Sequence, residues 1–165
     1  MKVRSSLAAF ALAAAAASPA ALAQSGTVRI AWMDPLSGMM APLGQNQLRS
    51  WQYAAELANK EKWAGDVKFE IVSFDNKLSP QESLTLLRAA IDQGIDYIAQ
   101  GNGSGVAIAL ADAIEKHNTR NPGQELVYLN YAAVDPSLTN EKCSFWHFRL
   151  DINADMKMEA LTTYM

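Results

Sequence analysis

Cysteine is nearly absent from this 165-residue sequence, since Cys143 is the only one. A single cysteine excludes a disulfide within the chain and any zinc site built on paired cysteines. Two interpretations of Cys143 stay open: a buried, inert thiol, which we favour, or a thiol whose partner lies outside this sequence. No other group of residues indicates a metal or a cofactor, and we expect neither.

Clusters of basic residues are missing as well. Without Lys2 and Arg4, which lie in a predicted leader, the 14 basic residues become 12, against 17 acidic ones. Proteins that bind nucleic acid displace counterions with clustered Lys and Arg, so we expect no nucleic-acid partner.

Long apolar runs are confined to the beginning of the chain. Two basic residues precede the apolar stretch 7–17, which is shorter than the roughly 20 residues of a transmembrane helix. Residues 21–23, Ala-Leu-Ala, then give a small-x-small cleavage pattern. We therefore predict that residues 1–23 are a signal peptide and that the mature, exported chain begins at Gln24. A membrane anchor or an alanine-rich helix of the fold is the less favoured alternative.

A catalytic constellation is also missing. Neither His117 nor His147 is accompanied by a nucleophile in a pattern such as G-x-S-x-G. Asp75 and Asp96 are interpreted as turn and strand-edge residues, and not as an acid/base pair. The sequence therefore predicts a protein that is not an enzyme.

From residue 28 onward, short apolar segments alternate with segments of helical periodicity. Apolar strands separated by helices predict an α/β fold with a doubly wound, mainly parallel sheet covered on both faces. Ligands of such sheets bind where the loops gather at the carboxyl ends of the strands. The expected strands are 28–33, 67–71, 95–99 and 126–129, and the expected helices are 45–59, 80–93 and 104–116.

The helix expected at 80–93 has the clearest boundaries. Ser79 is expected at the N-cap and Glu82 at N3, which would complete a capping box, and Gly94 would end the helix. Its buried stripe is expected at Leu84, Leu87 and Ile91.

A glycine-rich segment, QGNGSGV, precedes the helix expected at 104–116. It lacks both the position of a dinucleotide fingerprint, which belongs in the first βα turn, and the lysine of a Walker motif, so we expect no nucleotide site. The amides of Gly103 to Val106, the helix dipole and the Ser104 hydroxyl together suit one small anion, such as a carboxylate. An equally favoured alternative is that the glycines only allow close packing of helix and strand.

Five segments occur in the order typical of one family. They are DPLSGMMAPLGQ, FDNKLSPQESLTLLRAAIDQGIDYI, GNGSGVAIALADAIEKHN, AAVDPSLT and FWHFRLD. From about Val28 to its last residue the chain resembles the periplasmic solute-binding proteins of ABC importers, of the branched-chain amino acid (leucine/isoleucine/valine-binding) type. The resemblance implies a type I periplasmic binding protein fold, in which two lobes close on a small molecule. It also implies a periplasmic location and a membrane permease as partner.

The resemblance divides the chain into parts. Residues 24–143 would be ligand-binding lobe one, and residues 144–150 would be a hinge strand. Residues 151–165 would begin lobe two, which we expect to be truncated here, because a helix in progress stops at Met165 without a cap or a following strand.

The resemblance also implies a ligand site. Ser104 matches the family's carboxylate-binding serine, and Ala132 and Ala133 match a loop that offers backbone groups. Two positions depart from the family: Val134 stands where a threonine is usual, and Leu43 where an aromatic residue is usual. Both make the pocket more apolar, so a carboxylate with an apolar or aromatic body competes with an α-amino acid as the ligand. The expected ligand-binding residues are Leu43, Asn102, Gly103, Ser104, Gly105, Tyr131, Ala132, Ala133 and Val134.

Two other functions stay open. A ligand-sensing domain of a receptor or regulator would share the fold and would be followed by a transmembrane or signalling segment. An α/β enzyme would need the catalytic constellation that this sequence lacks.

Overall fold

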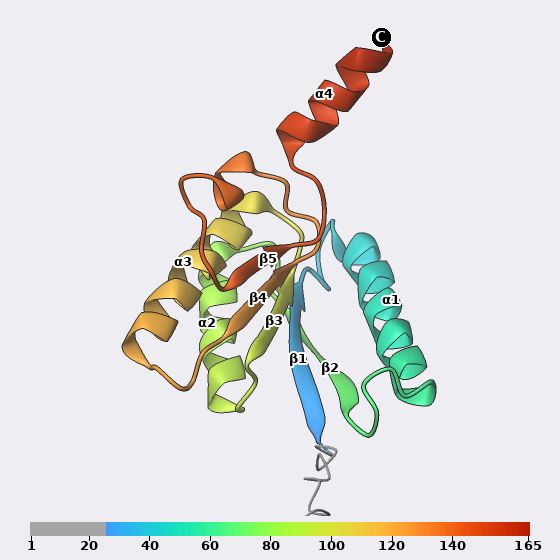
Figure 1. The fold of residues 1–165 in the computed structure, drawn as a ribbon, viewed down its shortest axis with the longest axis vertical. Helices are drawn as coiled ribbons and strands as arrows, with labels where there is room; N and C mark the ends of the chain where they lie inside the picture. Colours follow the sequence, from blue (N-terminus) through green and yellow to red (C-terminus); the bar gives the residue numbers. More distant parts are fainter. Residues whose placement is uncertain (1–25) are drawn as a thin grey trace, which may run out of the picture.

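The computed structural model describes residues 26–165, which form a five-stranded parallel sheet flanked by helices (Figure 1). The strand order is β2-β1-β3-β4-β5, and every neighbouring pair is parallel. This confirms the α/β, doubly wound fold class predicted from the alternation of strands and helices. The elements are β1 (Thr27–Asp34), α1 (Ala41–Lys60), β2 (Lys68–Asp75), α2 (Pro80–Asp92), β3 (Tyr97–Gln100), α3 (Ser104–Arg120), β4 (Val127–Asn130), the 3-10 turn η1 (Pro136–Thr139), β5 (His147–Arg149) and α4 (Ala154–Tyr164).

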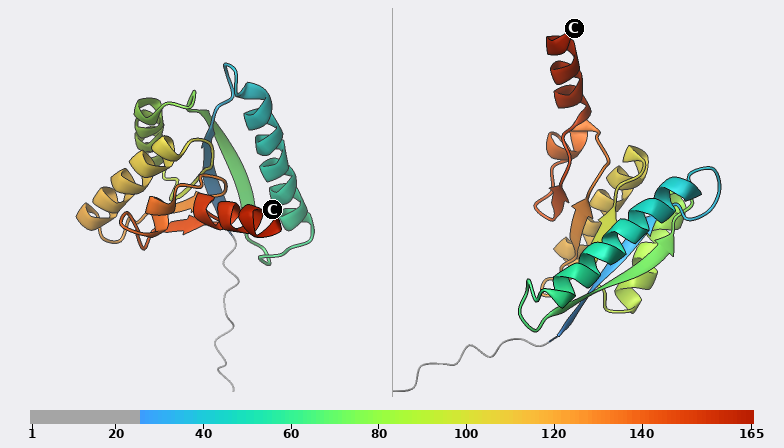
Figure 2. Two further views of the ribbon diagram at one scale, coloured as in Figure 1. Left: turned by 90° about the horizontal axis from the view of Figure 1, so that it is seen from above. Right: turned by 90° about the vertical axis from the view of Figure 1, so that its right-hand side faces the viewer.

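Helices α2 and α3 cover one face of the sheet, and α1 lies on the other (Figures 1 and 2). The reason is the strand order. The chain moves outward from β1 to β2 and then back past β1 to β3, and right-handed crossovers in opposite directions place their helices on opposite faces. The direction therefore switches between β1 and β3, and a crevice for ligands is expected at the carboxyl ends of these two strands.

The hydrophobic core lies between the sheet and the α2/α3 pair. On α3, Val106, Leu110 and Ile114 are all buried and form one stripe toward the sheet. The stripe on α2 is displaced from the prediction, since only Leu87 of the expected three is fully buried. The small side chains of Ser83 and Ala90 occupy the other fully buried positions of α2, and the expected residues Leu84 and Ile91 are half-buried.

The turn before α2 has the predicted N-cap but not the predicted capping box. Ser79 is the N-cap, as predicted, and its hydroxyl accepts a hydrogen bond from the Glu82 amide at 3.3 Å. The capping box is not completed, because the Ser79 amide donates to the Asn76 carbonyl at 2.9 Å and the Glu82 carboxylate lies 3.9 Å from Lys77 Nζ. A backbone with φ of 53° at Lys77 folds the turn back onto Asn76. Gly94, with φ of 67°, ends the helix region as predicted.

Helix α1 begins at Ala41, four residues before the predicted start at residue 45. Gly44 was interpreted as part of a loop, but it lies inside the helix and packs against Pro35. A Cβ at Gly44 would come within 1.8 Å of the Pro35 carbonyl oxygen, so glycine is required by this contact. The loop after β1 is therefore short, and it brings the first turn of α1 to the edge of the sheet.

The segment after β4 contains Cys143 and the last helix, α4. Cys143 is exposed, so the interpretation that favoured a buried thiol is wrong. The chain makes a surface turn there, in which the Cys143 amide donates to the Asn140 carbonyl. Further on, α4 extends away from the sheet and has no buried residue (Figures 1 and 2).

The predicted signal peptide at residues 1–23 lies outside the described residues. Within residues 26–165, no helix combines the length and the apolar character that crossing a membrane requires.

Candidate ligand-binding site

The segments predicted to bind ligand meet at the carboxyl edge of the sheet. The glycine-rich segment follows β3, the Tyr131–Val134 segment follows β4, and Leu43 lies in the first turn of α1. This is the edge where the strand direction switches, so the three segments border the expected crevice.

The glycine-rich segment leads into α3, which begins at Ser104 as predicted. Gly103 is the N-cap with φ of 87°, and its carbonyl accepts hydrogen bonds from Val106 and Ala107 at 3.0 and 3.1 Å. Within residues 26–165 the amides of Ser104 and Gly105 make no hydrogen bond, as is usual in the first turn of a helix. A Cβ on Gly105 would meet no atom within 4 Å, so open space lies beside these amides.

The preceding amides of the same loop are bound by Asp34, whose role no local sequence pattern indicates. Asp34 ends β1 with a fully buried side chain. Its carboxylate accepts hydrogen bonds from the amides of Gly101 and Asn102, both at 2.8 Å, and from the hydroxyl of Tyr131. Burial raises the pKa of Asp34, and the hydrogen bonds from Tyr131, Asn102 and Gly101 oppose that rise.

Tyr131 and Gln47 extend this network to the other two segments. Gln47 of α1 accepts a hydrogen bond from the Asn102 side chain at 2.6 Å, and the Tyr131 hydroxyl lies 3.3 Å from the same oxygen. Burial, followed by the nearby charge of Asp34, raises the pKa of Tyr131, so its hydroxyl keeps its proton and donates it. The ring of Tyr131 also packs against Trp51 of α1, with centroids 5.6 Å apart.

Glycine occupies each of its three positions in this loop for a different physical reason. A Cβ on Gly101 would lie 2.7 Å from the Tyr131 ring, so this glycine permits close packing. Gly103 adopts a left-handed backbone that other residues avoid. Only Gly105 faces open space. The loop therefore packs closely in its first part and leaves the amides of Ser104 and Gly105 unbonded within residues 26–165. The Val106 amide, which was expected to be free as well, donates to the Gly103 carbonyl.

Asn102 is buried, and three of its polar groups are bonded within the protein. Its amide donates to Asp34, its side chain donates to Gln47, and its carbonyl accepts from Gln100 at 2.5 Å.

The loop after β4 is organised by Asn130. Its side-chain oxygen accepts from the amides of Ala132 and Ala133 at 3.2 and 2.8 Å, and its nitrogen donates to the Ala133 carbonyl at 3.0 Å. The carbonyl of Val134 accepts from Ala154, at the start of α4. Within the described part of the chain, the carbonyls of Tyr131 and Ala132 accept no hydrogen bond, so both are available to a donor.

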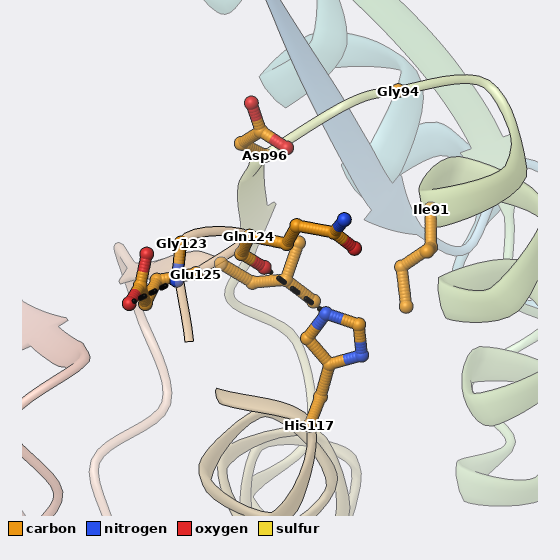
Figure 3. Close-up of a pocket in the computed structure, with 8 residues that line it drawn as sticks. Ile91, Gly94, Asp96, His117, Gly123, Gln124 and Glu125 are labelled. Carbon is orange, nitrogen blue, oxygen red and sulfur yellow. Dashed lines mark hydrogen bonds between the residues drawn. The ribbon is translucent and has the colours of Figure 1, made fainter. Parts of the chain in front are cut away.

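A cavity of about 400 Å³ lies at the opposite, amino edge of the sheet (Figure 3). Two of its polar side chains bond residues close to them in the sequence. His117 Nε2 lies 3.1 Å from the Gln124 carbonyl, and Glu125 accepts from the Gly123 amide at 2.8 Å. None of the predicted ligand-binding residues lines this cavity. Over residues 26–165, no three His, Cys, Asp or Glu side chains are grouped as a metal site would need.

The fold and the position of these loops are those of a periplasmic binding protein. The periplasmic binding protein family matches residues 27–165, and the chain belongs to this family. The resemblance to the branched-chain amino acid type is confirmed by its relatives. A Leu/Ile/Val-binding protein homolog 4 from Brucella abortus (strain 2308) is 33% identical over 146 residues, which cover 88% of this chain and 35% of the relative. The chain thus spans about a third of the length of the curated relatives that it matches.

Two solved structures extend the comparison. The leucine-, isoleucine-, valine-, threonine- and alanine-binding protein from Brucella ovis, in a closed conformation, is 35% identical with a TM-score of 0.72, covering 78% of this chain and 33% of that one. A solute-binding protein of an ABC transporter from R. palustris, in complex with 4-hydroxybenzoate, is 25% identical with a TM-score of 0.61, covering 77% and 32% of the two chains.

Proposed function

We propose that this protein is the extracytoplasmic solute-binding component of an ABC importer. It would capture a small carboxylate between two lobes and deliver it to a membrane permease. The observation that carries the proposal is the pair of unbonded amides at Ser104 and Gly105, beside the Ser104 hydroxyl at the start of α3. Amides at the positive end of a helix dipole favour an anion, and they lie at the edge where this fold binds ligands.

The ligand class follows from the surroundings of these amides. The free carbonyl of Ala132 suits a donor such as an ammonium or hydroxyl group, whereas Val134 and Leu43 contribute apolar surface. An amino acid and an aromatic hydroxy acid both combine a carboxylate, a donor and an apolar body. The Brucella relatives are named for amino acids, and the R. palustris structure contains 4-hydroxybenzoate, so both classes belong to the proposal.

The division of the chain is part of the proposal. Residues 24–143 would form the ligand-binding lobe, residues 144–150 the hinge strand, and residues 151–165 the beginning of the second lobe. Support comes from α4, which lies apart from the sheet without a buried side chain (Figure 1). A periplasmic location reached through the signal peptide at residues 1–23 completes the proposal.

A thermal-shift screen of the whole mature protein tests this function. A ligand that binds the folded state raises the unfolding temperature, because it stabilises by RT ln(1 + [L]/Kd). L-leucine and 4-hydroxybenzoate are compared with their methyl esters, which keep the body of each ligand and remove the carboxylate charge. We expect stabilisation by at least one acid and by neither ester. Equal stabilisation by acid and ester would contradict a carboxylate site at Ser104.

A further inference from the structure

The glycine-rich loop is divided into two halves by hydrogen bonding. The amides of Gly101 and Asn102 are bound by Asp34, and those of Ser104 and Gly105 are unbonded within residues 26–165. A carboxylate of the protein itself thus occupies the first half of the loop, next to the half that is proposed to receive the carboxylate of the ligand.

Burying the charged side chain of Asp34 at this position is unfavourable in free energy. Its side chain is fully buried, and no Lys or Arg of the described residues forms an ion pair with it. A buried carboxylate without a cation is strongly disfavoured unless its oxygens are hydrogen-bonded. Asp34 meets this condition with the two loop amides and the Tyr131 hydroxyl, and the Gln100 side chain lies 3.5 Å away.

Those hydrogen bonds join parts of the chain that are far apart in the sequence. Asp34 ends β1, its amide donors follow β3, and Tyr131 follows β4. Gln47 adds the first half of α1 through its contacts with Asn102 and Tyr131. Two of the three segments that border the expected crevice therefore bond one carboxylate, and α1 is joined to both of them through Gln47.

We propose that Asp34 is a positioning residue for ligand binding: it holds the first half of the glycine-rich loop so that the Ser104 and Gly105 amides face the crevice. The inference rests on the proposed function, because it assigns the free amides to a ligand. Asp34 itself is buried behind the loop and does not touch the ligand.

Asp34→Asn is the informative substitution. The side chain keeps its shape, but one carboxylate oxygen becomes an NH₂ group that must face either the Gly101 amide or the Asn102 amide, and two donors cannot bond each other. One of these two amides therefore loses its hydrogen bond to residue 34. Because hydrogen bonds to charged groups contribute about 1.5–3 kcal/mol, we expect the Kd of the ligand to rise roughly tenfold or more.

Asp75→Asn is the matched control. Asp75 ends β2 beside Asp34 in the register of the sheet, and its carboxylate also accepts from two amides, those of Leu36 and Lys77 at 2.9 and 3.0 Å. It makes no hydrogen bond to the glycine-rich loop. A general effect of removing a carboxylate from this edge would appear in both variants, and a positioning effect only in Asp34→Asn.

Two measurements on the whole mature protein decide the matter. Hydrogen exchange of residues 101–107 without ligand reports how the loop is held, and calorimetry with L-leucine and 4-hydroxybenzoate reports affinity. We expect Asp34→Asn to accelerate loop exchange severalfold and to weaken whichever probe binds the wild type, and Asp75→Asn to change neither. Wild-type loop exchange in Asp34→Asn would overturn the inference, as would equal acceleration in Asp75→Asn.

The two proposals fail in different ways. If neither probe binds the wild-type protein, the choice of ligand in the proposed function fails, and loop exchange alone still decides the role of Asp34. If Asp34→Asn does not fold, Tyr131→Phe replaces it, because it keeps the ring and removes one donor to the carboxylate. Faster exchange at residues 101–105 in Tyr131→Phe would then support the inference, and unchanged exchange would overturn it.

Discussion

The two edges of the sheet use polar side chains differently. At the carboxyl edge, hydrogen bonds join distant parts of the chain: Asp34 and Gly101 are 67 residues apart, and Asn102 and Gln47 are 55 apart. Around the cavity in Figure 3, at the amino edge, the bonds of the lining residues are local, because His117 and Gln124 are seven residues apart and Gly123 and Glu125 are two apart. Local bonds shape turns, whereas distant ones fix the relative positions of whole loops. The difference therefore separates the loops that are proposed to bind a ligand from the turns around the cavity.

Gly101→Ala tests the carboxyl edge with the largest expected effect. The new methyl group would come 2.7 Å from the Tyr131 ring, which hydrogen bonds and the contact with Trp51 hold in place. We expect a loss of about 1–3 kcal/mol in the free energy of unfolding, as is usual for overpacking, measured by urea denaturation. Gly105→Ala is the control, because its methyl group meets open space within a helix, and there we expect a gain of up to about 1 kcal/mol. Equal stability of the two variants would contradict the packing assigned to Tyr131.

Ser104→Ala tests ligand affinity without changing the hydrogen bonds around Asp34. The Ser104 hydroxyl makes no hydrogen bond within the described residues, so stability should hardly change. The loss of one hydrogen bond to a carboxylate should raise Kd roughly tenfold, measured by calorimetry. An unchanged Kd in a folded variant would remove Ser104 from the proposed site.

His147 provides a pH-dependent test outside both edges. Burial lowers the pKa of His147 below its usual value of 6.5, and the ring stacks on Tyr128 with centroids 5.0 Å apart. The folded state thus favours the neutral ring, so this contribution to stability is complete above pH 6.5 and is lost as the pH falls through the lowered value. We expect His147→Phe to lose less stability than wild type on acidification, measured by urea unfolding above and below pH 6.5. A variant as sensitive to acid as wild type would rule out His147 as the source.

The smallest effect is expected at the amino edge. His117→Gln removes a ring whose nitrogens, within residues 26–165, contact the Gln124 carbonyl and the Asn121 side chain and no other group. We expect stability to change by no more than about 0.5 kcal/mol and Kd to stay unchanged. A weaker affinity in this variant would break the contrast between the two edges.

The sequence predicts what is encoded locally. The start of α3 at Ser104 follows from the glycines and the helical pattern around it, and the end of α2 follows from Gly94. Asp34 was missed because its partners are 67 and 97 residues away, and no pattern near Asp34 indicates them. Gly44 lies outside the predicted helix for a different reason, because its packing against Pro35, nine residues away, depends on the helix being in position.

The internal carboxylate of Asp34 has a consequence for the kinetics of binding. A loop that is already held by hydrogen bonds need not be ordered when a ligand arrives, so little conformational entropy remains to be lost at that moment. We therefore expect association rates that differ little among accepted ligands, and selectivity that resides in how long each one stays bound. In Asp34→Asn the ordering of the loop would become part of binding, and association itself would slow.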